Sequence, residues 1–160
     1  LHAIEVPENL GDTMFCNMVI AYCGLSDGLK AAIADLRCVH DAAAETEQVR
    51  KQDSLEQRPP APPPVSHPLV RTHVESGEKS LYANPHYVTH IEGFTAAESA
   101  PLLDYLYNTA LRPENIYRHR WRAGDVLMWD NSRTMHYAIR DYNDNTVRVM
   151  HRTMAVGGRT

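Results

Sequence analysis

The sequence predicts a mainly β fold in which helices pack outside an antiparallel sandwich. Its segments follow the order strand, helix, long polar loop, hairpin, second helix and then a run of strands. This order is typical of sheets that carry their helices on the outside. The chain has 160 residues, of which 43% are apolar, which is enough for one core and too few residues for two ordinary domains. We therefore expect a single domain over residues 1–160.

The first forty residues predict one strand and two helical segments. Residues 1–6 form a strand that ends at Pro7, and residues 8–12 form a turn. Residues 14–25 are mostly apolar and predict a short helical stretch. Ser26 is suited to cap a further helix, whose apolar residues recur at helical spacing and predict core packing. These residues are Leu29, Ala32, Ile33, Leu36 and Val39.

Residues 41–66 interrupt this pattern of apolar segments. Residues 41–58 are polar, and the prolines of residues 59–64 require an extended, polyproline-like chain. In a globular protein a loop of this length is a lid or a disordered segment. A ligand for a proline-recognition domain is the alternative interpretation.

The middle of the chain predicts a hairpin followed by a helix. Residues 69–73 and 80–83 are strand-like and flank a turn at residues 75–78. Thr95 and Glu98 form a capping box at the start of the helix, and Arg112-Pro113 ends it. Pro101 predicts a kink or a late start of this helix. The expected buried side carries Leu102, Leu103, Leu106 and Ala110.

The last third of the chain predicts three strands. Residues 116–122 alternate, residues 126–129 are apolar and follow a turn at 123–125, and residues 148–154 alternate again. In the last strand Arg148, Met150 and Arg152 share one face. The tryptophans in these segments, Trp121 and Trp129, are assigned to packing.

Composition excludes several classes of function. A net charge of −4 without a run of Lys or Arg argues against nucleic acid and anionic membranes as partners. No apolar run reaches the length of a membrane span. Three cysteines without a Cys-x-x-Cys pair favour free thiols in a reducing cytoplasm. Because the chain begins at Leu1, we expect it to be part of a longer protein.

Arg148, Arg152 and His136 suggest a site for chemistry near the end of the chain. Two arginines four residues apart on a strand have Cα atoms about 13 Å apart, but their long side chains can reach one space. Arginine binds carboxylates and other oxyanions with two parallel hydrogen bonds. His136 lies on a neighbouring predicted strand. Together they suggest a metal beside an anion site.

The motifs of this region resemble those of a known enzyme family. Trp129-Asp130-Asn131, the stretch 134–138 around His136, and the stretch 148–152 are similar to the C-terminal motifs of the TauD/TfdA family, the Fe(II)- and 2-oxoglutarate-dependent dioxygenases. The resemblance extends to the segments 4–13, 67–73 and 119–125. It covers most of the chain outside residues 41–66, and it implies a double-stranded β-helix, or jelly roll.

The resemblance implies roles for four residues. His136 corresponds to the distal histidine ligand of the iron, and Arg148 and Thr13 correspond to the residues that bind the distal carboxylate of 2-oxoglutarate. Arg152 corresponds to a residue that grips an acidic substrate. Apart from the resemblance, Tyr87 is a candidate for lining the substrate side, but packing in the core is the preferred interpretation of this tyrosine. Leu10 stands where the family has the first glycine of a Gly-Gly-Asp-Thr turn.

Two iron ligands are missing from this pattern. The family takes them from a His-x-Asp motif upstream of the Gly-Asp-Thr turn, which would precede Leu1 by this spacing. Within the chain, His90-x-Glu92 has a similar form at another place, and His40-Asp41 are adjacent and would point differently. We therefore expect that this chain alone builds no complete iron centre.

The implied reaction hydroxylates a small, anionic substrate with O2 and 2-oxoglutarate, and releases succinate and CO2. A sulfonate, a sulfate ester or a carboxylate would fit Arg152. The alternative is a non-catalytic jelly-roll fragment or a carboxylate-binding module. We also expect uncovered sheet edges to favour a homo-oligomer.

Overall fold

The computed structural model describes residues 1–43 and 61–155. The chain divides into two compact units, which are treated separately below: unit 1 comprises Leu1–Cys16 with Ile116–Thr160, and unit 2 comprises Asn17–Asn115. Among the described residues, unit 1 contains strands and loops alone, whereas the helices all belong to unit 2, which also contains five strands. The expectation of one domain over residues 1–160 stays a prediction.

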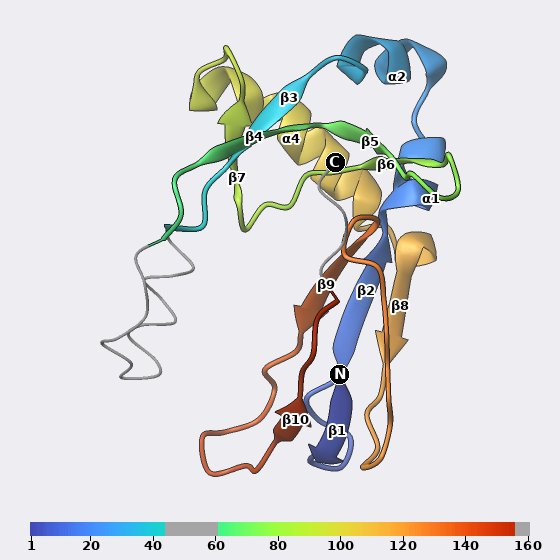
Figure 1. Cartoon of the computed structure of the whole chain (residues 1–160), viewed down its shortest axis with the longest axis vertical. Coiled ribbons are helices and arrows are strands. Elements are labelled where there is room, and N and C mark those ends of the chain that lie inside the picture. The colour runs from blue at the N-terminus through green and yellow to red at the C-terminus, as the bar shows by residue number, and fades with distance from the viewer. Residues whose placement is uncertain (44–60, 156–160) are drawn as a thin grey trace. The chain divides into compact units, whose positions relative to one another are not determined.

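Unit 1 consists of short strands and the loops between them (Figure 1). Strand β2 is the middle of a three-stranded sheet with the order β8-β2-β9, and β1 pairs with β10. Both β2–β8 and β1–β10 are antiparallel. The strands are β1 (His2–Glu5), β2 (Thr13–Asn17), β8 (Ile116–His119), β9 (Thr134–Ala138) and β10 (Val149–His151).

The core of unit 1 gathers around β2. Thr13, Phe15 and Cys16 are buried, and the ring of Phe15 meets the ring of Trp129 edge-on with centroids 4.9 Å apart. Trp121 is 5% exposed, so its predicted packing role is confirmed. Strand β2, which has buried side chains on both of its faces, thus lies at the centre of this small unit.

Two predictions that concern unit 1 were wrong in whole or in part. The helical stretch predicted over residues 14–25 is confirmed at Met18–Cys23, whereas residues 14–17 belong to β2, whose neighbours in the sheet are β8 and β9. Residues 126–129 form no strand: only an isolated bridge joins Val126 to His2, and Leu127 exchanges two main-chain hydrogen bonds with Leu1. Residues 116–122 and 148–154 form shorter strands than expected.

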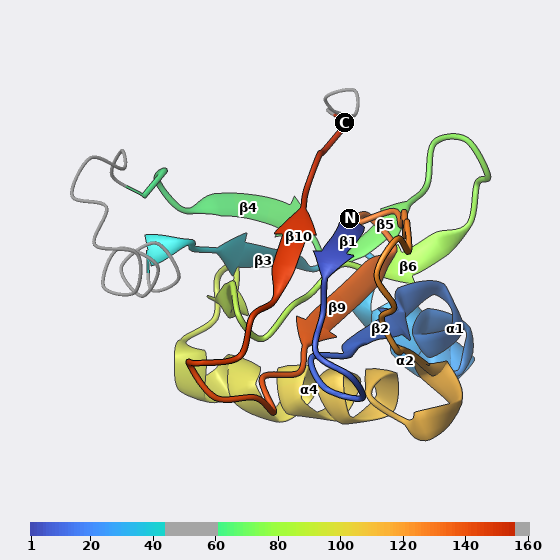
Figure 2. The same cartoon turned by 90° about the horizontal axis from the view of Figure 1, so that it is seen from below.

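Unit 2 combines two small sheets with helices. One sheet has the order β4-β3-β7, and β5 and β6 form a hairpin. Helix α4 packs against β7, and α1 packs against β6 (Figures 1 and 2). The elements are α1 (Met18–Cys23), α2 (Asp27–Ile33), β3 (Arg37–His40), β4 (Val65–Pro68), β5 (Val70–Thr72), β6 (Lys79–Leu81), β7 (Val88–Ile91), α4 (Ala96–Ala110) and the 3₁₀ helix η1 (Pro113–Asn115).

Helix α2 begins as predicted but ends early. The Ser26 hydroxyl accepts a hydrogen bond from the Leu29 N–H at 3.3 Å, so the predicted N-cap is confirmed. The helix stops at Ile33, and Leu36 and Val39 lie beyond it, contrary to the expected stripe. Strand β3 takes over at residue 37 because β4 and β7 pair with it on both sides.

Helix α4 confirms the predicted capping box. Thr95 Oγ1 accepts from the Glu98 N–H, and the Glu98 carboxylate accepts from the Thr95 N–H at 2.8 Å. The helix begins at Ala96 and includes Pro101, so the alternative of a late start was wrong, and the alternative of a kink stays a prediction. Leu103, Leu106 and Ala110 are buried as predicted, and Leu102 is half-buried.

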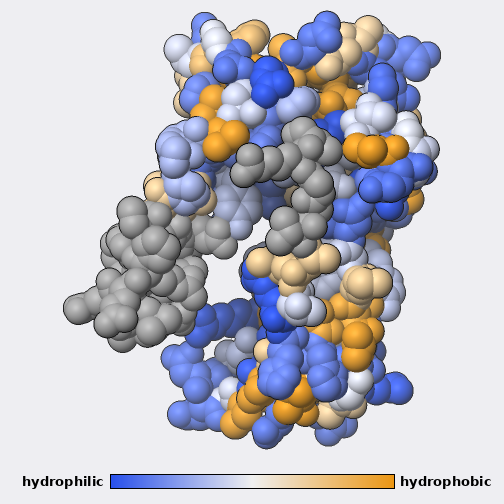
Figure 3. All heavy atoms as spheres, in the orientation of Figure 1, coloured by the Kyte–Doolittle hydropathy of each residue, from blue (hydrophilic) through white to orange (hydrophobic). Residues whose placement is uncertain are grey.

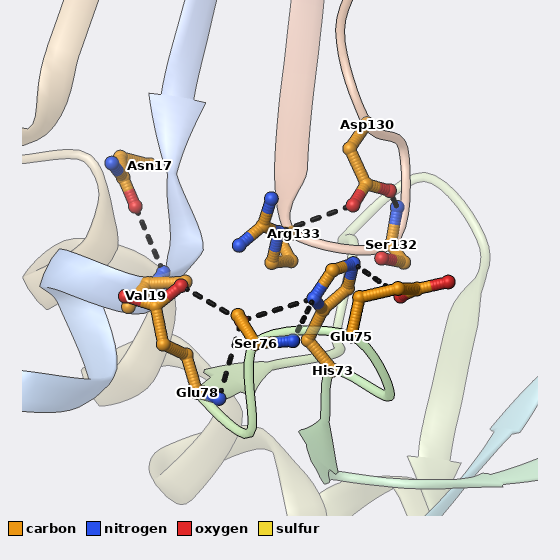
Figure 4. Close-up of polar contacts among 9 residues, drawn as sticks. All are labelled: Asn17, Val19, His73, Glu75, Ser76, Glu78, Asp130, Ser132 and Arg133. Carbon is orange, nitrogen blue, oxygen red and sulfur yellow. Dashed lines mark hydrogen bonds and ion pairs between the residues drawn. The ribbon is translucent and has the colours of Figure 1, made fainter.

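The hairpin β5–β6 is confirmed, and a polar network holds its turn (Figure 4). His73 Nε2 lies 3.0 Å from the Glu75 carboxylate, and its Nδ1 lies 3.0 Å from Ser76 Oγ. The same hydroxyl donates to Glu78 at 2.9 Å. Polar contacts among these four side chains therefore hold the turn between the two strands.

The segment 41–66 was predicted as a lid or a disordered loop. Residues 44–60 lie outside the described part of the chain, and so does most of this prediction. Val65–Pro68 form β4, which pairs with β3 and which the sequence did not predict.

The surface carries apolar residues between hydrophilic ones, as the visible face shows (Figure 3). Within unit 1 the most exposed large apolar side chains are Met128, at 93%, and Val126, at 75%. In the part of the chain that is described, no helix has the length and apolar character needed to cross a bilayer.

Candidate 2-oxo acid and metal site

A tight turn in unit 1 leads into β2 and carries the first candidate residue. Asn9 and Gly11 adopt positive φ angles of 59° and 70°. Asn tolerates this left-handed region and Gly does so without strain. Leu10 needs no such angle, so its presence in place of a glycine is compatible with the turn. The Gly11 N–H donates to the carboxylate of Asp141 at 2.7 Å, which fixes the turn from the other end of the unit.

Asp12 anchors this turn in the core of unit 1. Its side chain is almost fully buried and accepts a hydrogen bond from Arg118 Nε at 2.7 Å. Its main-chain oxygen accepts from the Ile139 N–H at 2.8 Å. A buried carboxylate needs such a partner, and the two bonds tie the turn to β8 and to the end of β9.

Thr13 follows directly and is 2% exposed. Its Oγ1 accepts a hydrogen bond from Trp121 Nε1 at 2.9 Å. The sequence assigned Trp121 to packing alone and missed this bond. The hydroxyl proton of Thr13 is left to donate, because an indole N–H can only be a donor.

Arg148 lies against the same turn. A Cβ built on Gly11 would be 3.0 Å from Arg148 Nε, 3.1 Å from its Cδ and 3.2 Å from Cε1 of Tyr142. The side chain of Arg148 therefore lies directly against Gly11, in space that a side chain at position 11 would fill. Arg148 Nε is buried and has no hydrogen-bond partner among the described residues. A buried donor of this kind normally has an acceptor, and a carboxylate would supply one.

His136 lies on β9 with its ring against two aromatic rings. The centroid of Trp129 is 5.1 Å away and that of Phe15 is 6.3 Å away. The residue as a whole remains exposed. Burial of the ring lowers the pKa of His136, and the positive charge of Arg152 lowers it further. Both effects favour the neutral imidazole, which is the form that binds metals.

The turn before β9 is held by the carboxylate of Asp130 (Figure 4). It accepts from the Ser132 N–H at 2.7 Å and from Arg133 Nε at 3.1 Å. Burial alone would raise the pKa of Asp130, but the hydrogen bonds from Ser132 and the charge of Arg133 lower it. The Trp-Asp-Asn segment thus forms a charged turn that leads into the strand of His136.

The structure brings only some of the predicted residues together. Gly11 joins Arg148 to the turn of Thr13, and the charge of Arg152 acts on His136. Arg152 lies beyond the end of β10 and is exposed, and its Nη2 contacts Met154 Sδ at 3.1 Å. Tyr87 belongs to unit 2, is half-buried and precedes β7, so its substrate role stays a prediction.

The alternative metal-ligand pairs are engaged elsewhere within unit 2. Glu92 accepts from Ser66 Oγ at 2.8 Å and pairs with Arg37 Nε at 3.4 Å. The His40 ring stacks on Tyr82, with centroids 5.4 Å apart. Within residues 1–43 and 61–155, no three His, Cys, Asp or Glu side chains gather as a metal site would require.

Comparison with known proteins gives a consistent result. The profile of the family described as "Taurine catabolism dioxygenase TauD, TfdA family" matches residues 1–154. The alpha-ketoglutarate-dependent 2,4-dichlorophenoxyacetate dioxygenase of Burkholderia sp. (strain RASC) is 39% identical over 159 residues, which are 99% of this chain and 53% of that protein. The alpha-ketoglutarate-dependent sulfate ester dioxygenase of Pseudomonas putida is 34% identical over 164 residues, 98% of this chain and 54% of that protein.

A solved structure gives the same picture of the fold. The crystal structure of AAD-2 in complex with Mn(II) and N-oxalylglycine matches with a TM-score of 0.77 and 32% identity, over 93% of this chain and 59% of that chain. The chain thus has the fold of this double-stranded β-helix group, as predicted. It spans about half the length of the curated relatives it matches, 53% and 48% for two of them.

Proposed function

The chain belongs to the TauD, TfdA family of taurine catabolism dioxygenases, and we propose that the full-length protein is an Fe(II)- and 2-oxoglutarate-dependent dioxygenase. The observation that carries this proposal is the buried, unpartnered Nε of Arg148 above Gly11. It lies at the turn that presents the buried hydroxyl of Thr13. Two donors at one turn fit the distal carboxylate of 2-oxoglutarate, which can accept several hydrogen bonds.

Each residue has a part in this reaction. Arg148 and Thr13 bind and orient 2-oxoglutarate, and His136 contributes one metal ligand. The family's activity implies a metal, which when bound supplies the activation of O2. The remaining ligands come, in this proposal, from parts of the protein outside the described residues. The balanced outcome is that substrate C–H, O2 and 2-oxoglutarate give substrate C–OH, succinate and CO2.

The substrate in this proposal is a small anion. The similar enzymes are named for 2,4-dichlorophenoxyacetate and for sulfate esters, which are both anionic. Arg152 is exposed, and its charge acts on His136, the proposed metal ligand. In this proposal its guanidinium binds the anionic group of the substrate. Cytoplasmic location belongs to the same proposal and is supported by three free cysteines.

The test is an anaerobic titration of the full-length protein with Fe(II) and 2-oxoglutarate, followed by the visible metal-to-ligand charge-transfer band. Arg148→Ala should weaken 2-oxoglutarate binding about tenfold or more, because a hydrogen bond to a charged group contributes about 1.5–3 kcal/mol. His136→Ala should abolish the band. Arg140→Ala is the matched control, since Arg140 is exposed and pairs with Asp144.

Two outcomes would count against the proposal. The wild-type protein could give no band and no succinate with phenoxyacetates, alkyl sulfates or sulfonates. Alternatively, Arg148→Ala could bind 2-oxoglutarate as tightly as Arg140→Ala does. The second result would show that Arg148 does not bind 2-oxoglutarate, but it would not contradict the proposed dioxygenase reaction.

A further inference from the structure

Trp121 makes a polar contact that packing alone does not explain. The residue is 5% exposed, and its Nε1 donates to the Oγ1 of the buried Thr13 at 2.9 Å. We propose that Trp121 is a positioning residue, which fixes the Thr13 hydroxyl as a hydrogen-bond donor to the distal carboxylate of the 2-oxo acid. This inference rests on the proposed function and extends it to a residue that acts through Thr13.

The first argument is the hydrogen-bonding capacity of a hydroxyl. Thr13 has one proton to donate and oxygen lone pairs to accept with, whereas an indole N–H only donates. Because the Thr13 oxygen accepts the hydrogen bond from Trp121, the hydroxyl proton of Thr13 is directed away from the indole and is available to another acceptor. A carboxylate carries acceptors only. The contact therefore sets Thr13 in the donor role that a carboxylate needs, and it polarises the hydroxyl in the favourable direction.

The second argument is the register of the sheet. Strands β2 and β8 are antiparallel, with Thr13 opposite His119. Continued by two residues, this register sets Trp121 opposite Gly11 and diagonal to Thr13, within reach of a long side chain. Gly11 is the residue on which Arg148 rests. The indole thus serves the same turn that carries both proposed carboxylate donors.

The third argument is that the indole is itself held in place. The His119 ring meets the Trp121 ring edge-on, with centroids 4.4 Å apart at 83°. His119 Nε2 lies 3.2 Å from the carboxylate of Asp125, which also accepts from the Arg122 N–H at 2.9 Å. Residues on both sides of Trp121 therefore restrain it, and a restrained donor positions its partner with little loss of entropy.

The test compares two ligands that differ only in the distal group. Calorimetry on the full-length protein with Mn(II), without O2, measures binding of 2-oxoglutarate and of 2-oxopentanoate, which lacks the distal carboxylate. Trp121→Phe keeps a buried ring and removes the N–H. We expect it to weaken 2-oxoglutarate binding roughly three- to tenfold, the effect of one hydrogen bond, and to leave 2-oxopentanoate binding unchanged. A purely structural role would weaken both.

A double-mutant cycle tests the route through Thr13. If Trp121 acts through the hydroxyl, Trp121→Phe should have no further effect on 2-oxoglutarate affinity in a Thr13→Val background. Additive losses would overturn the inference, as would equal 2-oxoglutarate affinity in wild type and Trp121→Phe. Wild-type protein that binds no 2-oxoglutarate would instead overturn the proposed function, so the two failures are distinguishable.

A spectroscopic measurement covers the case in which Trp121→Phe fails to fold. With Zn(II) in place of Mn(II), the indole N–H signal of Trp121 in a ¹⁵N-correlation spectrum should shift on addition of 2-oxoglutarate and not of 2-oxopentanoate. Sequential assignment from the backbone amides distinguishes the indole signal of Trp121 from those of the other tryptophans, among them Trp129. An unmoved Trp121 signal at saturating 2-oxoglutarate would overturn the inference.

Discussion

Gly11 joins two requirements at one residue. Its φ of 70° is strained for most side chains, alanine included, and its missing side chain leaves room for Arg148. We predict that Gly11→Ala costs about 1–2 kcal/mol of stability through the left-handed angle. It should also weaken 2-oxoglutarate binding about tenfold or more, because Arg148 must move from a contact of 3.0 Å. Thermal melting and calorimetry measure the two effects.

Gly77 provides the matched control for this prediction. It has nearly the same φ, 71°, but nothing lies within 4 Å of the position where its Cβ would be. Gly77→Ala should therefore cost similar stability and leave 2-oxoglutarate affinity unchanged. If both variants lose affinity alike, general destabilisation is the cause and the contact with Arg148 has no role.

Functional residues that belong to a sequence motif could be predicted, whereas a residue whose role depends on a contact with a distant segment could not. Thr13 and Arg148 came from the resemblance. Thr13 is buried, the Nε atom of Arg148 is buried, and both residues lie at one turn, which fits that assignment. The hydrogen bond of Trp121 could not be predicted, because its partner is 108 residues away. Alternation along a strand indicates which face a side chain takes, but not which atom it reaches.

Strand β3 carries a histidine whose environment predicts a pH effect on stability. Burial, and then the nearby charge of His67, lowers the pKa of His40 to about 4. Between pH 4 and 6.5 the unfolded chain thus binds a proton at His40 that the folded chain does not. The free energy of unfolding should fall as the pH is lowered through this range, by roughly 1–3 kcal/mol after allowance for partial exposure.

Chemical denaturation between pH 7 and 4 measures this effect. His40→Phe keeps a ring that can stack on Tyr82 and cannot titrate. The variant should show a smaller loss of stability over the same range. An identical loss in both proteins would assign the acid sensitivity to other groups, among which His67 also has a lowered pKa.

At the scale of elements, local signals fixed where helices begin, and pairing decided where they end. Ser26 and the pair Thr95 and Glu98 are caps that act within one turn, so the sequence predicted them correctly. The end of α2 depends on β4 and β7, which recruit residues 37–40 into a sheet. The same cause turned residues 14–17 into β2. Strand pairing between distant segments overrides local periodicity.

At the scale of the whole molecule, exposed apolar residues beside weakly paired backbone predict association. In unit 1, Val126 is 75% exposed and Met128 is 93% exposed. Leu127 lies between them, and in the described part of the chain its main-chain hydrogen bonds join it to Leu1. Such edges pair with other chains unless a charge blocks them. The apolar pattern predicted a strand over residues 126–129, but the pattern does not show whether a neighbouring strand is present to pair with it.

We therefore expect the chain of residues 1–160 to self-associate at micromolar concentration and above, and Met128→Lys to reduce this without loss of stability, since its side chain is almost wholly exposed. Light scattering coupled to size-exclusion chromatography gives the mass of each species. Tyr105→Lys is the control, because Tyr105 is 53% exposed on α4 and lies on no sheet edge. A monomeric wild-type peak would refute the expectation. Equal relief by both substitutions would mean that added charge acts generally, whereas relief by Met128→Lys alone would locate the association at residues 126–128.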